Sequence, residues 1–294
     1  MTIPITIGIC AYNEEKNIER TIRSVFMQEQ QCYSIDRILV VSSGSTDRTD
    51  EIVRALEEED SRVRLLPQKS REGKNSAINL ILSETQTEVN VLLNADNVFK
   101  TPVSLDYLIK PMEDPKVGVV GGHPYPTNDP SDIAGFTVQL VWVMHHHISL
   151  VNPKVGEIMA FRDIGTVLPT DMQSDEDILR MELEKKGFRT VYAPEASILN
   201  RGPETIKDYL KQRMRVNIGE RYMKRIFDYD IPTHNFGNLF RALLDSAKDI
   251  GFHPFKLMAA IFLELLSRYQ AILYVKADMG DLCVWEQVET TKKV

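Results

Sequence analysis

The sequence predicts an α/β protein with a mainly parallel central sheet flanked by helices, and a helical extension at the C-terminal end. Within about the first hundred residues, four apolar stretches of strand length alternate with helical patterns, which is typical of βαβ units with parallel strands. The fourth stretch, Val89–Leu93, is almost continuously apolar, as expected of a strand buried on both faces. With 294 residues, of which 43% are hydrophobic and 26% charged, the chain can bury one large core, or a core plus a smaller helical part.

The first four strands are expected at residues 3–10, 37–41, 63–66 and 89–93. After the first strand, Ile18, Ile22 and Val25 recur at helical spacing. Asn13 is expected to cap this helix and to place Glu14 in its first turn. A polar turn follows each of the four strands, and parallel strands bring such turns to one edge of the sheet. We therefore expect the site at that edge.

Beyond residue 100 the pattern loosens. Further strands are expected at residues 117–120, 158–161 and 188–192, and helices after Pro102, over 133–150, before Gly187 and from Glu204 onward. The histidines His145 to His147 would point in different directions on a helix, so we expect a partly buried helix beside a groove rather than one metal site. The helix after Glu204 is rich in Lys and Arg, which form either a solvated face or a clamp for a diphosphate.

Composition restricts the class of protein. The net charge of −7 argues against a general affinity for nucleic acid. Cys10, Cys32 and Cys283 form no CxxC pair, which favours a reducing compartment over a disulfide frame or a zinc site. The first residues do not resemble a signal peptide. The apolar stretch 257–275 is interrupted by charged side chains and is expected to be too polar to span a bilayer. A cytoplasmic location is therefore expected.

The turn after the fourth strand carries the chemistry. Asn94, Ala95, Asp96 and Asn97 follow Val89–Leu93 directly. A carboxylate with amide neighbours at such an edge suits Mg²⁺ or Mn²⁺ bound together with a phosphate. The alternative is that these residues only build a turn, since Asn and Asp favour turns.

Taken together, these turns resemble those of the inverting family 2 glycosyltransferases of the GT-A fold, and the resemblance covers about residues 3 to 220. Its nucleotide loops are similar to residues 11–15, 41–47 and 71–75, and Asn94-Ala95-Asp96 stands where the family has Asp-x-Asp. The nucleotide-sugar-binding residues that the resemblance implies are Ala11, Tyr12, Asn13, Glu14, Ser42, Ser43, Arg71, Gly73, Lys74, Asn94, Ala95 and Asp96. The implied metal ligand is Asp96.

The resemblance continues through the second half. The stretch Gly156–Arg162 resembles the strand that lines the donor sugar and the acceptor, and Asp175-Glu176-Asp177 falls at the acidic motif that holds the catalytic base. Asp175 and Glu176 remain equal candidates for the base, while the local pattern keeps Asp177 open. The residues implied near the diphosphate and the acceptor are Gln212, Arg213 and Arg215.

Three positions depart from the family pattern. Ser42-Ser43 replaces two aspartates, one of which usually reads the base, so uracil and guanine both remain open. Asn94 replaces the first carboxylate of the metal motif. Asn200 stands near a position where the family often has a histidine ligand, and it would be a weak ligand.

The resemblance implies an inverting glycosyltransferase, a hexosyltransferase of glycan biosynthesis. It would move a sugar from a UDP- or GDP-sugar to a glycan, lipid-linked or small-molecule acceptor with the help of Mg²⁺ or Mn²⁺. The implied catalytic domain is 1–230, with a nucleotide-binding half (1–100) and an acceptor and base half (101–230). One alternative is a non-catalytic nucleotide-sugar binder. A sugar nucleotidyltransferase would require a glycine-rich, basic first loop, whereas this one is acidic and free of glycine.

Residues 231–294 are expected to form a C-terminal helical extension outside the catalytic resemblance. Leu239, Phe240, Leu243 and Leu244 follow Phe236 at helical spacing, and Leu257, Ile261, Leu265 and Leu266 repeat the pattern. These two amphipathic helices would pack on the catalytic domain or on a second copy of the chain. The alternative is peripheral contact with the inner face of a membrane, near a lipid-linked acceptor.

Overall fold

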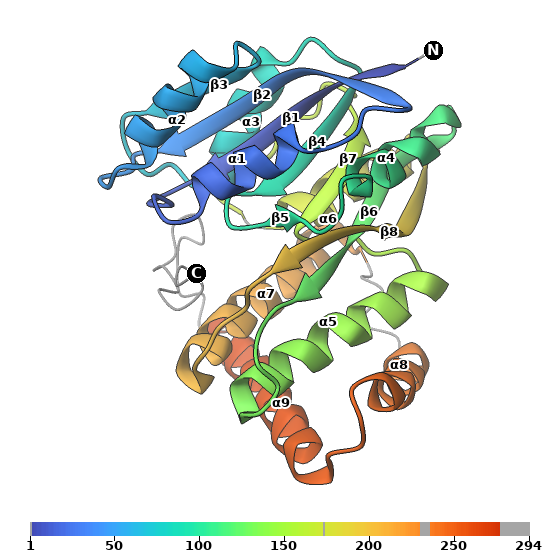
Figure 1. Cartoon of the computed structure of the whole chain (residues 1–294). Coiled ribbons are helices and arrows are strands. Elements are labelled where there is room, and N and C mark those ends of the chain that lie inside the picture. The colour runs from blue at the N-terminus through green and yellow to red at the C-terminus, as the bar shows by residue number, and fades with distance from the viewer. Residues whose placement is uncertain (1, 173, 230–235, 277–294) are drawn as a thin grey trace.

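The computed structural model describes residues 2–172, 174–229 and 236–276. A single sheet runs through the described part of the chain, with helices on both of its faces (Figure 1). Its strands are β1 (Ile3–Ala11), β2 (Tyr33–Ser43), β3 (Val63–Gln68), β4 (Val89–Asn94), β5 (Val98–Phe99), β6 (Val117–Pro126), β7 (Ile158–Arg162) and β8 (Arg189–Asn200). Their spatial order is β3-β2-β1-β4-β7-β6-β8-β5. The α/β prediction is confirmed.

The helices follow the expected alternation with the strands in the first half of the chain. They are α1 (Ile18–Phe26), α2 (Thr49–Glu59), α3 (Lys74–Glu84), α4 (Ser104–Ile109), the short 3₁₀ helix η1 (Lys110–Glu113), α5 (Ile133–Val151), α6 (Asp175–Lys185), α7 (Ile206–Phe227), α8 (Phe236–Asp249) and α9 (Pro254–Lys276). The apolar sides of α1, α2 and α4 pack on one face of the sheet, and those of α3 and α6 pack on the other.

The strands β1 to β4 are parallel, as predicted. In β1, Ile5, Ile7 and Ile9 are fully buried against α1 and α2, because alternate side chains point to the same face of a strand. Gly8 faces the opposite side, where a Cβ would lie 2.8 Å from side-chain carbons of Ile81 on α3. This close approach lets α3 lie directly on the strand. The carboxyl ends of the four strands consequently share one edge.

The second half of the sheet is mixed. β7 lies antiparallel between β4 and β6, whereas β6 and β8 are parallel to each other. Because β7 runs in the opposite direction, its first residues lie beside the last residues of β4, with Ile158 opposite Leu93. The loop before β7 therefore reaches the same edge as the turns after β1 to β4.

Several boundaries differ from the sequence prediction, and two of them have clear local reasons. Asn13 does not cap α1: its φ of 52° is left-handed, and the helix begins five residues later at Ile18. β8 does not end at Tyr192. It continues through Pro194 to Asn200, because β6 is longer than expected and pairs with β8 as far as Pro126.

The remaining helices, α5, α7, α8 and α9, gather at one end of the sheet (Figure 1). Ala260 of α9 packs against Phe136 and Leu140 of α5, and Ala271 of α9 packs against Ile218 of α7. By length and composition, α9 is long and apolar enough to cross a membrane, which corrects the prediction for residues 257–275. The helix begins at Pro254, so it includes Phe255, and only a small part of its surface is buried.

Candidate functional site

Hydrogen bonds join the first two turns of the sheet edge. The backbone N–H of Asn13 donates to the Oγ of Ser45 over 3.1 Å, and the Oδ1 of Asn13 accepts from the N–H of Thr46 over 2.8 Å. Ser42 donates to the same Ser45 hydroxyl over 2.9 Å. These contacts account for the left-handed backbone of Asn13, since Asn tolerates this conformation better than most residues. The turns after β1 and β2 thus form one surface.

The third turn joins this surface through Ser43 and Arg71. The Oγ of Ser43 accepts from the N–H of Glu72 over 3.1 Å. The guanidinium carbon of Arg71 lies 4.1 Å from the ring centre of Tyr12, which is a cation–π contact. Gly73 precedes α3 with a φ of 88°, a conformation that favours glycine. The three predicted nucleotide loops are therefore in contact with one another.

Lys74, the first residue of α3, links these loops to the acidic motif. Its Nζ lies 2.9 Å from the Oδ2 of Asp175 and 3.5 Å from the Oε1 of Glu176. The two acidic residues lie in the first turn of α6, not in a loop before it as expected. Burial raises the pKa of Glu176 to about 7, although the Lys74 cation lowers it. Burial would lower the pKa of Lys74, but the two carboxylates outweigh this effect and raise it.

Asp177 faces a different set of charges. Burial raises its pKa to about 6, while the nearby Lys154 lowers it and Glu220 raises it. Lys154 and Glu220 form their own ion pair at 3.3 Å. The structure thus brings Asp175 and Glu176 to Lys74, whereas Asp177 lies near the pair of Lys154 and Glu220.

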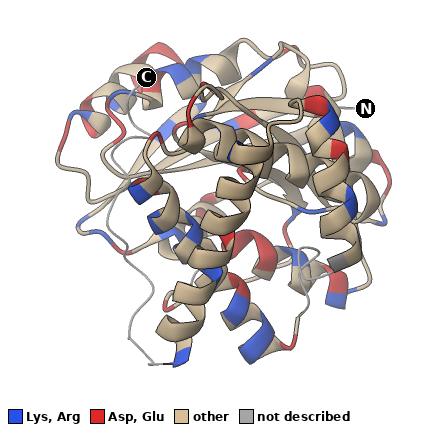
Figure 2. Ribbon diagram, turned by 90° about the horizontal axis from the view of Figure 1, so that it is seen from below, with Lys and Arg blue, Asp and Glu red and all other residues tan. Residues whose placement is uncertain are grey.

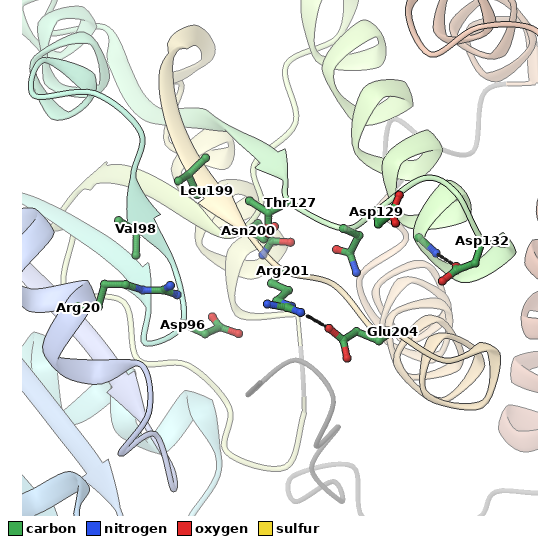
Figure 3. Close-up of a pocket in the computed structure, with 12 residues that line it drawn as sticks. Arg20, Asp96, Val98, Thr127, Asp129, Asp132, Leu199, Asn200, Arg201 and Glu204 are labelled. Atoms are coloured by element: carbon green, nitrogen blue, oxygen red, sulfur yellow. Dashed lines mark hydrogen bonds and ion pairs between the residues drawn. The ribbon is translucent and has the colours of Figure 1, made fainter. Parts of the chain in front are cut away.

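Asp96 lies at the mouth of a cavity of about 690 Å³ (Figure 3). The turn that carries it is fixed to α1, because the hydroxyl of Thr21 donates to the carbonyl of Ala95 over 2.8 Å. Arg20 of α1 and Asn200 at the end of β8 also line the cavity. The other lining residues are Val98, Thr127, Asn128, Asp129, Asp132, Gly135, Leu199, Arg201 and Glu204. Polar groups of both charge signs therefore surround Asp96.

Glu157 is held by the amides of the Asp96 turn. Its Oε2 accepts from the Nδ2 of Asn94 over 2.5 Å and from the Nδ2 of Asn97 over 3.1 Å. Its φ of 56° is left-handed, which is uncommon for a residue with a long side chain. Two hydrogen bonds thus offset a strained backbone just before β7. Asn94 consequently uses its amide to hold a carboxylate beside the predicted metal turn.

The predicted arginines of α7 have different partners. The carboxylates of Glu157, Asp175 and Glu176 act on the Arg215 guanidinium and oppose the lowering of its pKa by desolvation. Arg213 instead makes two 3.0 Å contacts with Glu264 of α9, through its Nε and its Nη2. The structure therefore places Arg215 with the acidic group of the site and Arg213 between α7 and α9. Gln212 lies beside Arg213 on α7.

The sequence profile described as "Glycosyl transferase family 2" matches residues 6–160, which is more than half of the chain and includes β1 to β4, Asp96 and Glu157. The chain belongs to glycosyl transferase family 2.

A curated relative in this family is the poly-beta-1,6-N-acetyl-D-glucosamine synthase of Staphylococcus aureus strain COL. It is 26% identical over 244 residues, which cover 79% of this chain and 58% of the synthase. The matched region therefore spans little more than half the length of that relative.

Solved structures share the fold at lower identity. PcManGT, a mannosyltransferase from Pyrobaculum calidifontis solved with GDP-Man and Mn²⁺, is 22% identical with a TM-score of 0.68, over 95% of this chain and 88% of that one. Residues 1–349 of TarS from S. aureus, solved with UDP, are 14% identical with a TM-score of 0.53, over 95% and 92% of the two chains. These similarities confirm the predicted GT-A fold.

Within this family member, sequence reasoning did not single out Arg20, Arg201 or Glu157. No motif distinguished Arg20 from the other residues of its helix, and its position beside Asp96 follows only from how α1 packs. Arg201 directly follows Asn200, which stands near the position where the family often has a histidine. That position could have drawn attention to Arg201. Glu157 lay within the stretch Gly156–Arg162 that was predicted to line the donor sugar and the acceptor, and this resemblance was the signal for it.

The three histidines of α5 point in different directions, as predicted. His145 is buried against Trp142, with ring centres 5.4 Å apart. His146 contacts the hydroxyl of Tyr192 at 2.8 Å, and His147 contacts Asp249 of α8 at 2.7 Å. Within the described ranges, no three His, Cys, Asp or Glu side chains form a group that could hold a metal ion on their own. Cys10 and Cys32 are free thiols, and Cys283 lies outside the described residues.

Proposed function

We propose that the chain transfers a sugar from a nucleotide-diphospho-sugar, with UDP or GDP as the nucleotide, to an acceptor hydroxyl, and that the transfer inverts the anomeric carbon. One observation carries this proposal. Lys74, at the end of the third nucleotide loop, contacts both Asp175 and Glu176, and so connects the donor side of the edge to the acidic motif. A binding protein without catalysis would not require a raised-pKa carboxylate at this point.

The proposed catalytic domain is 1–230, with its nucleotide-binding half at 1–100 and its acceptor and base half at 101–230. The contact between Tyr12 and Arg71 supports binding of the donor's nucleobase at the nucleotide loops, because both side chains stack well on flat rings. The contacts of Ser42 and Ser43 with neighbouring loops suggest that these residues shape the place where the nucleobase binds.

The residues present fit a divalent cation held chiefly by the donor. Mg²⁺ is usually bound by one or two carboxylates together with substrate phosphates. Asp96 supplies one carboxylate, Asn200 supplies an amide in the same cavity, and no larger ligand group occurs among the described residues. Asp96 would hold Mg²⁺ or Mn²⁺ there, with Asn200 nearby. Bound in this way, the ion would offset the negative charge that develops on the departing diphosphate.

The protein's own residues would carry out the remaining steps. Glu176 accepts the proton of the acceptor hydroxyl as its oxygen forms the bond to the anomeric carbon. The bond between that carbon and the diphosphate oxygen breaks, and the nucleoside diphosphate leaves. Asp175 positions Lys74, and Arg215 adds positive charge beside the leaving group. A single displacement of this kind inverts the anomeric centre.

The experiment that tests the proposal is a donor hydrolysis and transfer assay with a panel of UDP- and GDP-sugars, with Mn²⁺ and with a chelator. We expect Mn²⁺-dependent release of one nucleoside diphosphate, lost in Asp96→Ala. A matched control is Asp106→Ala, which removes a carboxylate on α4 that bonds the backbone of Cys32. Donor binding without turnover would support the alternative of a non-catalytic binder. Unchanged Mn²⁺ dependence in Asp96→Ala would contradict the metal assignment.

A further inference from the structure

The inner side of helix α9 carries two polar side chains, Glu264 and Ser267, beside the small or apolar Ala260, Leu263 and Ala271. Glu264 binds Arg213 of α7 and is also contacted by the Nε of Arg268, one turn further along α9, at 2.8 Å. The buried hydroxyl of Ser267 accepts from the Nδ2 of Asn217 over 2.9 Å. An ordinary surface helix instead turns its largest apolar side chains inward.

Large apolar side chains occupy the outer side of α9. We call this surface the outer face of α9; its members, with their exposed fractions, are Phe255 (85%), Met258 (67%), Phe262 (63%), Leu265 (61%) and Tyr269 (58%). The spacing of three and four residues places all five on one side of the helix. A continuous apolar strip of this length on a water-exposed helix indicates a surface that binds something else.

Helices α8 and α9 carry a small positive net charge, although the chain is acidic. Residues 236–276 contain five Lys and Arg (Arg241, Lys248, Lys256, Arg268 and Lys276) against three Asp and Glu (Asp245, Asp249 and Glu264), whereas the whole chain has a net charge of −7. In Figure 2, which looks at this end of the molecule, blue and red segments both occur on the helices, between long tan stretches. Glu264, the acidic residue of α9, is neutralised by Arg213 and Arg268. The apolar strip thus lies on a pair of helices with a small excess of cationic side chains.

We propose that the outer face of α9 lies on the surface of a lipid bilayer that contains anionic lipids. Apolar and aromatic side chains flanked by cations are the features by which helices bind in the plane of such a surface. The helix would lie flat and not cross the bilayer, because crossing would break the contacts of Glu264 and Ser267 with α7. A second copy of the chain fits less well, since it would bring together two pairs of helices that each carry a positive net charge.

This placement would bring the cavity beside Asp96 close to the bilayer. The Nζ of Lys256, in the first turn of α9, donates to the carbonyls of Pro130 over 2.8 Å and of Ser131 over 2.7 Å. Residues 127–129 and Asp132 of the same loop line the cavity beside Asp96. The inference goes beyond the proposed transfer reaction and does not depend on it.

The test is flotation of the full chain with two kinds of vesicle, phosphatidylcholine alone and phosphatidylcholine with phosphatidylglycerol. We expect the chain to float with the anionic vesicles, and binding to fall with added salt. The triple variant Phe255→Ser/Phe262→Ser/Leu265→Ser should reduce the bound fraction at least tenfold. The three positions are exposed, so the fold should persist, and circular dichroism together with nucleoside diphosphate binding would verify this.

The matched control is Met27→Ser/Tyr107→Ser, which removes two exposed apolar side chains far from α9 in the sequence. It should float as the original chain does. Failure of the original chain to float, or equal flotation of the triple variant, would overturn the proposal. It would also be overturned if light scattering found a dimer that only the triple variant loses, without vesicle binding, because the outer face would then join two copies.

Discussion

At the scale of single residues, Asp175 and Glu176 share one cation but have different surroundings. Asp175 is the closer partner of Lys74, and Glu176 is the carboxyl whose pKa burial raises to about 7. A general base works best with a pKa near the working pH, because it must be deprotonated and still attract a proton. These differences support two separate roles in the proposed reaction: Glu176 would take the proton, and Asp175 would hold Lys74.

We predict that Glu176→Gln lowers kcat by about two to four orders of magnitude while donor binding persists, because the amide cannot accept the proton. Asp175→Asn should have a smaller effect on kcat and should weaken donor binding, since Lys74 loses its closer partner. Steady-state kinetics and donor titration measure both. The reverse order of effects would exchange the two roles, and mild effects in both variants would move the base elsewhere.

In the proposed reaction, Lys74 would also set the pH at which Glu176 acts as the base. Its cation lowers the pKa of Glu176, so Lys74→Met should raise that pKa. Because only the deprotonated carboxylate is a base, the acidic limb of the kcat/KM profile should move to higher pH, by about one unit or more. Lys110→Met, which removes an exposed cation paired with Glu113, is the control and should leave the limb in place. A limb that stays in place in Lys74→Met would exclude Glu176 as the titrating group.

At the scale of elements, contacts between segments that are far apart in the chain could not be predicted from the sequence. The apolar run of β4 and the polar turn with Asp96 were predictable because both are local patterns. The partners of Arg213 and Arg215 were not predictable. The two side chains point to different sides of the helix, and only the packing of α9 decides which side faces inward.

The side of α9 that faces the protein could not be predicted from the sequence either. Leu257, Ile261, Leu265 and Leu266 predicted an apolar stripe that packs inward, yet Ile261 and Leu265 are exposed in the structure. The buried positions are Ala260, Leu263, Ser267 and Ala271. Small residues allow α9 to lie close to α5 and α7, and this close packing, not hydrophobicity, selects the inner side. Residues 231–235 and 277–294 of the predicted extension lie outside the described residues.

The contact between α7 and α9 should contribute measurably to stability. Glu264 is largely buried, and the arginines around it lower its pKa to about 2, although burial acts in the opposite direction. Glu264→Ala leaves two guanidinium groups without their carboxylate, so we predict a loss of about 2–3 kcal/mol in the free energy of unfolding. Urea unfolding measures it. Glu113→Ala, at an exposed pair with Lys110, should cost no more than about 0.5 kcal/mol.

The pH dependence of this contribution follows from the direction of the shift. The pKa of Glu264 is depressed in the folded chain, so the stabilisation is complete above its ordinary value of 4.5 and disappears as the pH falls through about 2. The stability difference between the original chain and Glu264→Ala should therefore narrow in acid. A constant difference from neutral pH down to pH of about 2 would mean that packing, not charge, explains the effect.

At the scale of the whole molecule, the site joins parts that are far apart in the sequence. The loops after β1, β2 and β3 contact one another, Lys74 ties them to α6, and Glu157 ties β7 to the turn after β4. A ligand bound across these loops should consequently stabilise the whole catalytic domain and not one loop. The same ties explain how α6 and α7, from the second half of the chain, supply charge to a surface built by the first half.

Ligand binding should therefore be visible as a shift of the entire unfolding transition. A nucleoside diphosphate at about one hundred times its Kd adds about 2.7 kcal/mol to the stability of the folded chain. For a domain of this size, that corresponds to a rise of several degrees in Tm. Differential scanning with UDP and GDP, each with Mn²⁺, measures the rise and identifies the nucleotide that Ser42 and Ser43 leave open. A chelator should reduce the shift, and Asp96→Ala with Mn²⁺ should match the original chain with the chelator. No shift with either nucleotide at saturating Mn²⁺ would contradict the assignment of the sheet edge as a nucleotide-sugar site.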